Sequence, residues 1–425
     1  MIVLYVPLVI ILVPVMSTKR SIAFLCHPYH RGGVTRWMAD AAIAAAVAGH
    51  EVYFLTVEPV SEFFSGKGRE TMLQLLGSRK GLVKIIKCSV GYEFEFGTDE
   101  YRSYIYKQLV VQLPLFTPVI LSDSEPTWIA ATAFYGTYPI VGVLHADEDY
   151  YYSLAEKYYK RVDIFACVSK RVSTITSKRI PEFNSDQIYT IPCGIEFSSL
   201  QRGGDDNAIL KLVYVGRISD YQKRTGDLLK MVSLLAKDNT SFHLDIIGDG
   251  VAARAVLEQR FKDEGLSKYV TFRGWLSKQE VAIYLSQSDI LLLTSDFEGT
   301  PIAMMEALAA GCGVVGTRVS GIEDYEHHQL ATGCYSVFAV GDIADAVQKI
   351  NKIATIPEQT RVTAARALAE SEFTMQVCMQ KYFAAIDEIQ MKPISPVKVK
   401  LSLFDRLYSG LIAFARYQKM KFSQK

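Results

Sequence analysis

Residues 289–317 constrain the fold of this chain more than any other stretch, because they alternate strand, loop, helix and strand. The apolar run at 289–294 (DILLLT) is typical of a strand buried on both faces of a parallel sheet. A helix is expected after Pro301, which fixes φ at a helix start, and it should end at Gly311, the residue type that most often stops a helix. A second strand starts at Gly313. The pattern predicts a strand–helix–strand unit whose loop lies at the carboxyl end of a parallel sheet.

The loop and the helix of this unit carry two carboxylates, Glu298 and Glu306. The free N–H groups of the loop and the helix start suit an anion, so carboxylates beside them indicate a ligand that also offers hydroxyl groups. A nucleotide sugar has both, with phosphates in the middle and a sugar at each end. Taken singly, each glutamate is more simply a solvated residue. The hypothesis rests on their spacing together with Gly299, Pro301 and the ALAAG ending of the helix.

This segment resembles the E-x7-E signature of family 4 of the retaining glycosyltransferases, which have the two-domain GT-B fold. The resemblance covers the chain from about Lys19 to about Ile389. It implies two doubly wound, Rossmann-like α/β domains that face each other across a cleft. It also implies sugar transfer with retention of anomeric configuration, through same-face attack by the acceptor hydroxyl with the leaving phosphate as base. No metal and no cofactor besides the donor substrate are expected.

The alternation of strands, helices and turns divides the chain into five segments. They are an apolar extension (1–18), an acceptor-side α/β domain (19–200), a nucleotide-sugar-binding domain (208–372), a helix that the resemblance implies crosses back to the first domain (373–391), and a basic tail (392–425). The domain boundary is placed in the linker at 198–207, where Gly203-Gly204 and two aspartates break the pattern.

Two places in the first domain are expected at the cleft. Gly33 ends a Gly-Gly pair at a helix start, where a ligand can approach the backbone. His145 ends the strand at 140–145, and the resemblance implies that it touches the donor sugar; a structural histidine is the alternative. Asp147 and Asp149 spell the D-x-D metal motif of the other major glycosyltransferase fold, but they begin a helix, where acids are favourable anyway.

The second domain opens with a strand at 211–215, followed by Gly216-Arg217 and Lys223. Arg217 offers a fixed fork of donors suited to phosphate, and Lys223 offers a mobile point charge. The segment resembles the phosphate site GRxxxxxK of the family. The resemblance implies that the turn at Gly248 lies near the nucleotide. It also implies that the segment after Arg273 borders the base. The complete donor-binding set is Gly33, Gly216, Arg217, Lys223, Gly248, Arg273, Glu298, Gly299, Thr300, Pro301 and Glu306.

Composition limits the partners of the protein. The formal net charge of +1 over 425 residues excludes a general nucleic-acid binder. The number of cysteines, seven, is odd, and none lies in a C-x-x-C pair, so we expect reduced thiols in the cytoplasm rather than disulfides or a zinc site.

The two ends differ from the rest of the chain. Residues 1–16 are apolar, but they are too short for a comfortable membrane span and are interrupted by Pro7 and Pro14. The first interpretation is an upstream over-extension of the coding sequence, and the second is a membrane-touching segment. Residues 392–425 hold eight Lys and Arg against one Asp, interleaved with Leu and Phe. Such a tail either packs on the protein or lies as a basic amphipathic helix on the inner face of a membrane, and both alternatives stay open.

These features predict a retaining hexosyltransferase that moves a sugar from a nucleotide sugar to a hydroxyl of a glycan or lipid-linked acceptor, in cell-surface polysaccharide synthesis. The catalytic roles fall to Glu298, His145, Arg217 and Lys223. The alternatives are a non-catalytic sugar-nucleotide-binding subunit, and a nucleotide-sugar epimerase or hydrolase on the same fold. A degenerate relative would be expected to lose Arg217, Lys223 or Glu298, and all three are present, which favours the enzyme.

Overall fold

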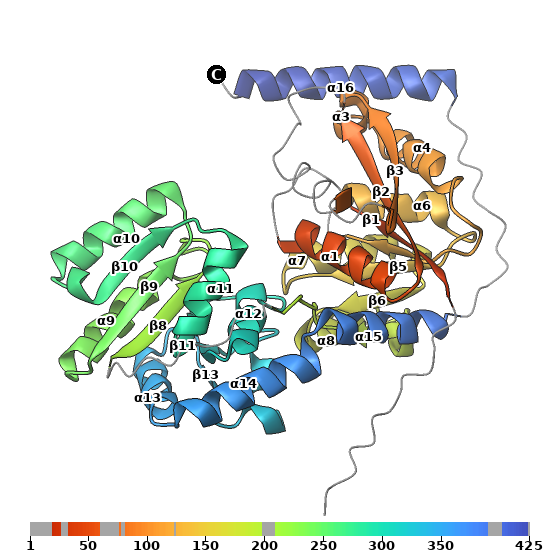
Figure 1. Ribbon diagram of the computed structural model, residues 1–425. Coiled ribbons are helices and arrows are strands. Elements are labelled where there is room, and N and C mark those ends of the chain that lie inside the picture. Colours follow the sequence, from red (N-terminus) through yellow and green to blue (C-terminus); the bar gives the residue numbers. More distant parts are fainter. Residues whose placement is uncertain are drawn as a thin grey trace, which may run out of the picture.

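The computed structural model describes residues 19–26, 33–59, 76–77, 81–122, 125–197, 209–389 and 402–423. The apolar extension, the loop before Gly33, the linker and the first part of the basic tail lie outside these residues. The described residues form two α/β lobes joined side by side (Figure 1).

The first lobe is built on a parallel sheet of seven strands in the order β3-β2-β1-β4-β5-β6-β7. Its strands are β1 (Ser21–Leu25), β2 (Glu51–Pro59), β3 (Val83–Val90), β4 (Val119–Leu121), β5 (Ile140–Leu144), β6 (Ile164–Cys167) and β7 (Ile188–Thr190). Its helices are α1 (Gly33–Val47), α3 (Tyr92–Phe96), α4 (Asp99–Val110), α5 (Glu125–Trp128), α6 (Ala130–Phe134), α7 (Asp149–Tyr158) and α8 (Lys170–Arg179). The chain reverses its direction across the sheet between β1 and β4, which makes this the switch point.

The second lobe has a parallel sheet of six strands in the order β10-β9-β8-β11-β12-β13. Its strands are β8 (Leu210–Val215), β9 (Phe242–Ile247), β10 (Val270–Gly274), β11 (Ile290–Leu293), β12 (Gly313–Thr317) and β13 (Tyr335–Phe338). Its helices are α9 (Gly226–Lys237), α10 (Val251–Asp263), α11 (Lys278–Gln287), α12 (Ile302–Ala310), α13 (Ile343–Ala354) and α14 (Glu358–Glu372). Here the switch point lies between β8 and β11.

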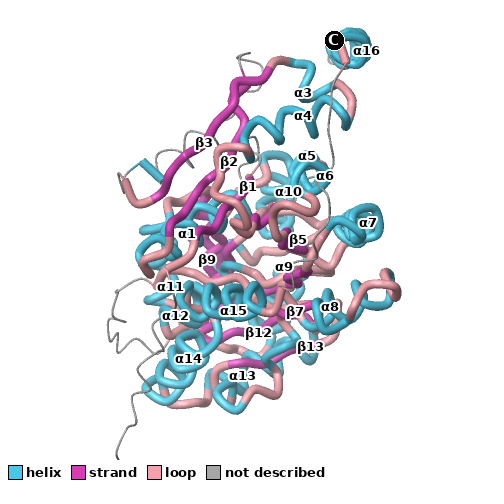
Figure 2. The backbone as a smooth tube through the Cα atoms, turned by 90° about the vertical axis from the view of Figure 1, so that its right-hand side faces the viewer, coloured by secondary structure: helices cyan, strands magenta, loops and turns pink. Residues whose placement is uncertain are grey.

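Continuous apolar strands explain both sheets. β5 (IVGVL) and β11 (ILLL) are buried along their whole length, as expected for central parallel strands with helices on both faces. Figure 2 shows helices on either side of the strands. The predicted fold class of two doubly wound parallel-sheet α/β domains is therefore confirmed.

Two helices at the end of the described chain lie on the first lobe. After α14 the chain passes Thr374, which bridges to Ile195, and continues as α15 (Met375–Asp387). α15 packs on α1, with Trp37 and Tyr382 ring centroids 5.8 Å apart. The last helix, α16 (Leu403–Ser423), lies on α3 at the outer end of the lobe (Figure 1). Within the described residues, none of the helices combines the length and the apolar character that a membrane crossing requires.

Candidate active site

Glu298 is the centre of a polar cluster at the carboxyl ends of β8 and β11. Its side chain is 8% exposed and forms an ion pair with Lys223, and Ser295 Oγ donates to the same carboxylate oxygen, Oε1, over 2.5 Å. A buried carboxylate is stable only with such partners. Lys223 and Glu298 are 75 residues apart in the chain, and the parallel arrangement of β8 and β11 brings them together.

The turn after β8 is held rigidly beside this pair. The hydroxyl of Tyr214 donates to the carbonyl of Arg217 over 2.7 Å. The Arg217 guanidinium donates to Gln222 Oε1 over 3.0 Å, and Gln222 Nε2 in turn donates to the carbonyl of Phe297 over 3.2 Å. Gln222 therefore ties the Arg217 turn to the Glu298 loop. The Arg217 side chain remains exposed, so its guanidinium is accessible to an anion.

Glycines line the carboxyl ends of β8, β9 and β10. Gly248 has φ +136°, a conformation that L side chains rarely adopt, and a Cβ there would overlap the carbonyl of Gly216. The N–H of Gly248 also donates to the carbonyl of Gly274 over 2.8 Å. Three strand ends thus approach one another as bare backbone, which leaves room for a ligand above them.

The helix start above Glu298 suits an anion. Pro301 is the residue before the first turn of α12, with φ −63° and ψ 123°, so the helix begins directly after Pro301, as the sequence predicts. The first turn of α12 carries no acidic residue, and no described side chain caps it by a hydrogen bond. The helix ends at Gly311, where φ is +87°, which confirms the predicted glycine stop. The positive end of the α12 dipole therefore faces the site without a carboxylate cap.

Glu306 lies on α12, and its electrostatic neighbours come from both lobes. Burial raises the pKa of its carboxyl group, Lys278 and Arg36 oppose that shift, and Asp40 adds to it. Within the part of the chain that the structure describes, no hydrogen bond to its side chain is found. A partly buried carboxylate without a donor is costly, and a ligand hydroxyl would relieve that cost.

The first lobe contributes its backbone to the same site. Gly299 packs so closely on the strand end after β5 that a Cβ would overlap the carbonyl of His145. The N–H of Asp147 donates to the carbonyl of Glu298 over 3.1 Å. A Cβ on Gly33 would lie 2.8 Å from the side chain of Ile302. The two lobes therefore meet directly at the Glu298 loop.

The side chains of His145 and Thr300 face the junction between the lobes. The His145 ring is buried, with Nδ1 3.9 Å from Cys193 Sγ and its centroid 5.3 Å from that of Trp37. The hydroxyl of Thr300 donates to the carbonyl of Val168 over 2.5 Å. The Thr300 hydroxyl thus forms a hydrogen bond between the lobes. The backbone of the loop lies beside the start of α12.

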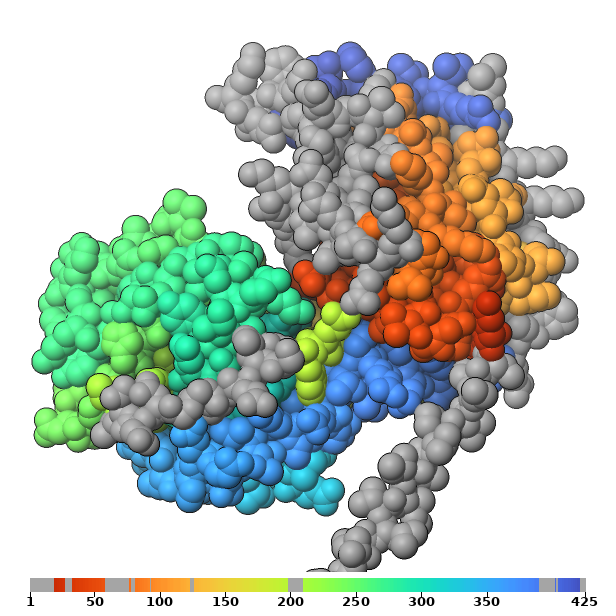
Figure 3. All heavy atoms as spheres, viewed as in Figure 1, coloured from red at the N-terminus to blue at the C-terminus, as the bar shows by residue number. Residues whose placement is uncertain are grey.

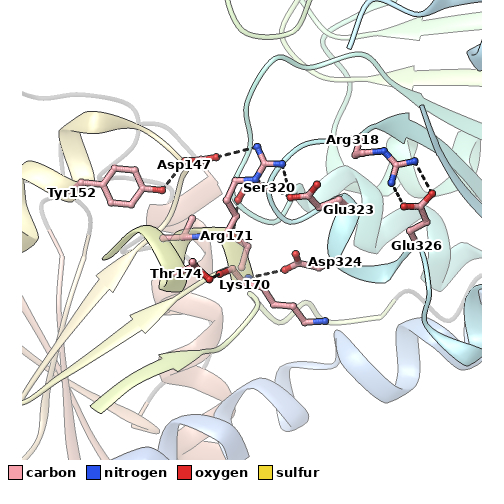
Figure 4. Close-up of polar contacts among 12 residues, drawn as sticks. Asp147, Tyr152, Lys170, Arg171, Thr174, Arg318, Ser320, Glu323, Asp324 and Glu326 are labelled. Carbon is pink, nitrogen blue, oxygen red and sulfur yellow. Dashed lines mark hydrogen bonds and ion pairs between the residues drawn. The ribbon is translucent and has the colours of Figure 1, made fainter. Parts of the chain in front are cut away.

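A polar seam continues this contact along the lobe boundary (Figure 4). The hydroxyls of Ser169 and Ser320 are 2.6 Å apart, and the N–H of Lys170 donates to Asp324 over 2.8 Å. The Arg171 guanidinium pairs with Glu323 over 2.5 Å and approaches Asp147 at 3.9 Å, as the dashed lines in Figure 4 show. The seam joins the end of β6 to the end of β12, so it closes one side of the space between the lobes.

Three charged residues considered in the sequence analysis, Asp147, Asp149 and Arg273, are paired with protein groups outside the Glu298 cluster. Asp147 accepts from the hydroxyl of Tyr152 over 2.6 Å, whereas Asp149 pairs with Arg179 over 2.8 Å. The two carboxylates of the D-x-D sequence therefore point to different protein partners. Arg273, on the edge strand β10, pairs with Asp245 over 2.7 Å. The structure therefore does not bring Arg273, a predicted donor-binding residue, into the Glu298 cluster.

Glu148 is a candidate site residue that the sequence analysis did not single out. It belongs to the first lobe, yet the charges of Arg217 and Glu298 both act on it. Burial raises the pKa of the Glu148 carboxyl group, Arg217 opposes the shift and Glu298 adds to it. The segment after β5 carries three acids within three positions, and only the tertiary structure distinguishes Glu148 from its neighbours Asp147 and Asp149.

Comparison with known proteins places this geometry in context. Residues 210–355 match the family model "Glycosyl transferases group 1", and the match lies within the second lobe. The amylovoran biosynthesis glycosyltransferase AmsK of Erwinia amylovora is 27% identical over 42% of this chain, and the match spans 45% of the length of that protein. Glycogen synthase of Mycobacterium tuberculosis is 25% identical over 88% of this chain and 96% of its own.

Solved structures share the two-lobed fold. The structure of Alr3699/HepE from Anabaena in complex with UDP and glucose superimposes with a TM-score of 0.66 at 16% identity, covering 86% of this chain and 99% of that one. The architecture of this protein is therefore the GT-B fold.

Proposed function

We propose that the protein is a glycosyltransferase that moves a sugar from a nucleotide sugar to a hydroxyl group of a glycan or lipid-linked acceptor, with retention of anomeric configuration. The observation that carries the proposal is the convergence of Lys223, Arg217 and the start of α12 around Glu298, at the switch point of the second sheet. The names of AmsK, a biosynthesis glycosyltransferase, and of the HepE complex with UDP and glucose support it. A role in cell-surface polysaccharide synthesis is part of the proposal.

The cations of the cluster suit the leaving group of such a transfer. Negative charge develops on the diphosphate as the bond to the sugar breaks, and preorganised donors at that place lower the barrier. Arg217 would grip phosphate oxygens through its fork, while Lys223, already oriented by Glu298, would supply a second positive charge. The N–H groups at the α12 start add to this field.

The carboxylates suit the two sugars of the donor. Glu298 would accept hydrogen bonds from hydroxyls of the transferred sugar, and Glu306 from those of the ribose. His145 and Glu148 come from the first lobe, so they would contact the sugar from the acceptor side. Retention follows if the acceptor hydroxyl attacks from the face that the diphosphate leaves and gives its proton to the phosphate.

Replacing Glu306 by Gln tests its part in donor binding. We expect roughly 10- to 100-fold weaker nucleotide-sugar binding at neutral pH, because hydrogen bonds to a charged acceptor contribute about 1.5–3 kcal/mol. Burial raises the pKa of Glu306, so its carboxylate takes up a proton at a higher pH than an ordinary glutamate does. Donor affinity of the unmodified protein should therefore fall as the pH drops through that raised pKa, and the variant should lose this pH dependence. Calorimetric titration at several pH values measures both effects.

Glu306→Gln should weaken donor binding but increase the stability of the free protein. A carboxyl group whose pKa is raised by folding costs stability once the pH rises through the window between its ordinary and its raised pKa. At neutral pH Glu306→Gln should therefore raise the melting temperature of the free protein while weakening donor binding. A variant that binds the donor as tightly as the unmodified protein would remove Glu306 from the donor site.

A chelator should leave the activity unchanged. Arg217, Lys223 and the α12 start are proposed to meet the phosphate charge, so no divalent cation is required. Transfer is measured with and without excess EDTA, and after addition of manganese or magnesium. Loss of activity in EDTA that manganese or magnesium restores would contradict this prediction and would make Asp147 and Asp149 candidate ligands.

A panel of nucleotide sugars tests the proposed reaction itself. Nucleoside diphosphate release should require both one donor of the panel and a glycan or lipid-linked acceptor, and NMR of the product should show the anomeric configuration of the donor. Equal release without acceptor would indicate a hydrolase, and interconversion of the donor sugar an epimerase. Donor binding without any turnover would indicate a non-catalytic subunit.

A further inference from the structure

α16 is docked on the first lobe through its small and polar face. Ser409 and Ala413 are fully buried, and Ser409 Oγ accepts from the N–H of Thr98 over 3.1 Å. The Arg416 guanidinium donates to the carbonyls of Phe96 and Gly97, each over 3.1 Å. These bonds to the end of α3 and to the residues after it fix the helix in one orientation. It lies across the outer end of the lobe in Figure 1 and is seen end-on in Figure 2.

The opposite face of α16 is apolar and open. Its large side chains are Phe404, Leu407, Tyr408, Leu411 and Phe414, which are 75%, 62%, 53%, 70% and 53% exposed. Their spacing of three and four residues aligns them in one stripe along the helix. We call these five residues the outer stripe. A contiguous exposed apolar patch of this kind marks an interaction site.

The charges around the outer stripe are basic. Lys419 of α16 is exposed, and Asp405 is the one acid of the helix. The exposed Arg406 and Arg416 add positive charge to the helix, although their guanidinium groups donate to the first lobe, to Tyr104 and to the carbonyls of Phe96 and Gly97. Over residues 392–425 eight Lys and Arg stand against this single Asp. Each basic residue near an anionic bilayer contributes on the order of 1 kcal/mol, and the aromatic and leucine side chains add burial in the interface.

We propose that the outer stripe of α16 lies on an anionic lipid surface, with the helix parallel to the membrane plane. An apolar stripe flanked by Arg and Lys is the pattern of a helix that rests in the interface. Anionic lipid matches both the stripe and the charges, whereas a second copy of the same basic helix would bring like charges together. Because Ser409 and Arg416 already bind the turn between α3 and α4, lipid binding would orient the whole first lobe.

The position of α16 also orients the space between the lobes. In Figure 3 the lobes are joined at the level of α14 and α15 and separate above it, toward the end that carries α16. A membrane under the outer stripe would face that opening. In this orientation a lipid-linked acceptor in the membrane would face the space between the lobes, a consequence that rests on the proposed function. The binding of α16 to lipid does not depend on sugar transfer.

Co-sedimentation with vesicles tests the proposal with the full chain. Vesicles are made of phosphatidylcholine alone or with phosphatidylglycerol, and the variants are Leu407→Glu/Leu411→Glu and the control Leu115→Glu. Leu115 is 68% exposed, close to the 70% of Leu411, but it precedes β4 at the opposite end of the parallel sheet from α3. We expect the unmodified chain and the control to bind phosphatidylglycerol vesicles at low salt, and binding to fall with added salt. The double variant should bind roughly tenfold or more weakly, as expected when two leucines no longer enter the interface.

Two results would overturn the proposal. One is equal sedimentation of the unmodified chain and the double variant; the other is no binding of the unmodified chain to phosphatidylglycerol vesicles. Light scattering of both proteins tests whether the outer stripe binds a second copy of the chain instead. If the unmodified chain is a dimer, the double variant is a monomer and neither binds vesicles, the outer stripe is a dimer interface. The vesicle arm needs no substrate, so its failure is distinct from failure of the proposed transfer.

Discussion

Glu298→Ala is expected to lower sugar transfer by roughly 100-fold or more, the size seen when a charge-organising group is lost from an active site. The Glu298 carboxylate accepts from Ser295 and pairs with Lys223, so its removal takes away the acceptor for sugar hydroxyls and leaves the Lys223 ammonium unoriented. The fold should survive, because the bonds that hold this loop to the first lobe use the Glu298 carbonyl and the Thr300 hydroxyl, and not the Glu298 side chain.

Purified variants and a steady-state transfer assay check this expectation. Glu298→Gln keeps an acceptor oxygen but loses the charge, so we expect an intermediate activity. Arg217→Ala should also lose roughly 100-fold, because its fork would bind the leaving diphosphate. The matched control is Asp345→Ala, which removes a carboxylate 3.8 Å from Lys349 on the surface of α13, a pair worth at most about 1 kcal/mol. Near-normal turnover in Glu298→Ala would remove the site assignment.

Gly299→Ala is expected to reduce transfer about as strongly, for a steric reason. The added methyl group would overlap the carbonyl of His145 and crowd Val168, both of the opposite lobe. A backbone carbonyl cannot rotate away as a flexible side chain can, so the Glu298 loop has to retreat. A displacement of about 1 Å at a reacting site can cost roughly 100-fold in rate.

The effect of Gly299→Ala should appear in the domain arrangement as well as in the rate. Small-angle scattering should show a larger radius of gyration, because the Glu298 loop and the first lobe have to move apart to admit the methyl group. Gly77→Ala is the control, since a Cβ there meets nothing within 4 Å and its φ lies outside the left-handed region. Full activity in Gly299→Ala would mean that turnover does not use this contact between the lobes.

Local patterns in the sequence determined the two sheets and the position of the central loop. Buried strands such as 290–293 are continuous apolar runs, and Gly311 stops α12 because a glycine accepts φ +87° without strain. These features depend on residues that are neighbours in the chain. They could therefore be predicted before the structure was considered, as could the placement of Glu298 at a carboxyl end.

Only the tertiary structure decided which groups meet. Lys223 pairs with Glu298 because β8 and β11 are adjacent, and the charges of Arg217 and Glu298 act on Glu148 because the lobes meet along the Arg171 seam.

The sequence alone also could not decide how the basic tail packs. Its pattern left packing on the protein and binding to lipid as alternatives, whereas in the structure α16 packs through Ser409 and Ala413 and leaves its apolar stripe exposed. Periodicity shows that a helix has two faces, but the carbonyls of Phe96 and Gly97, which accept from Arg416, select the face that is buried.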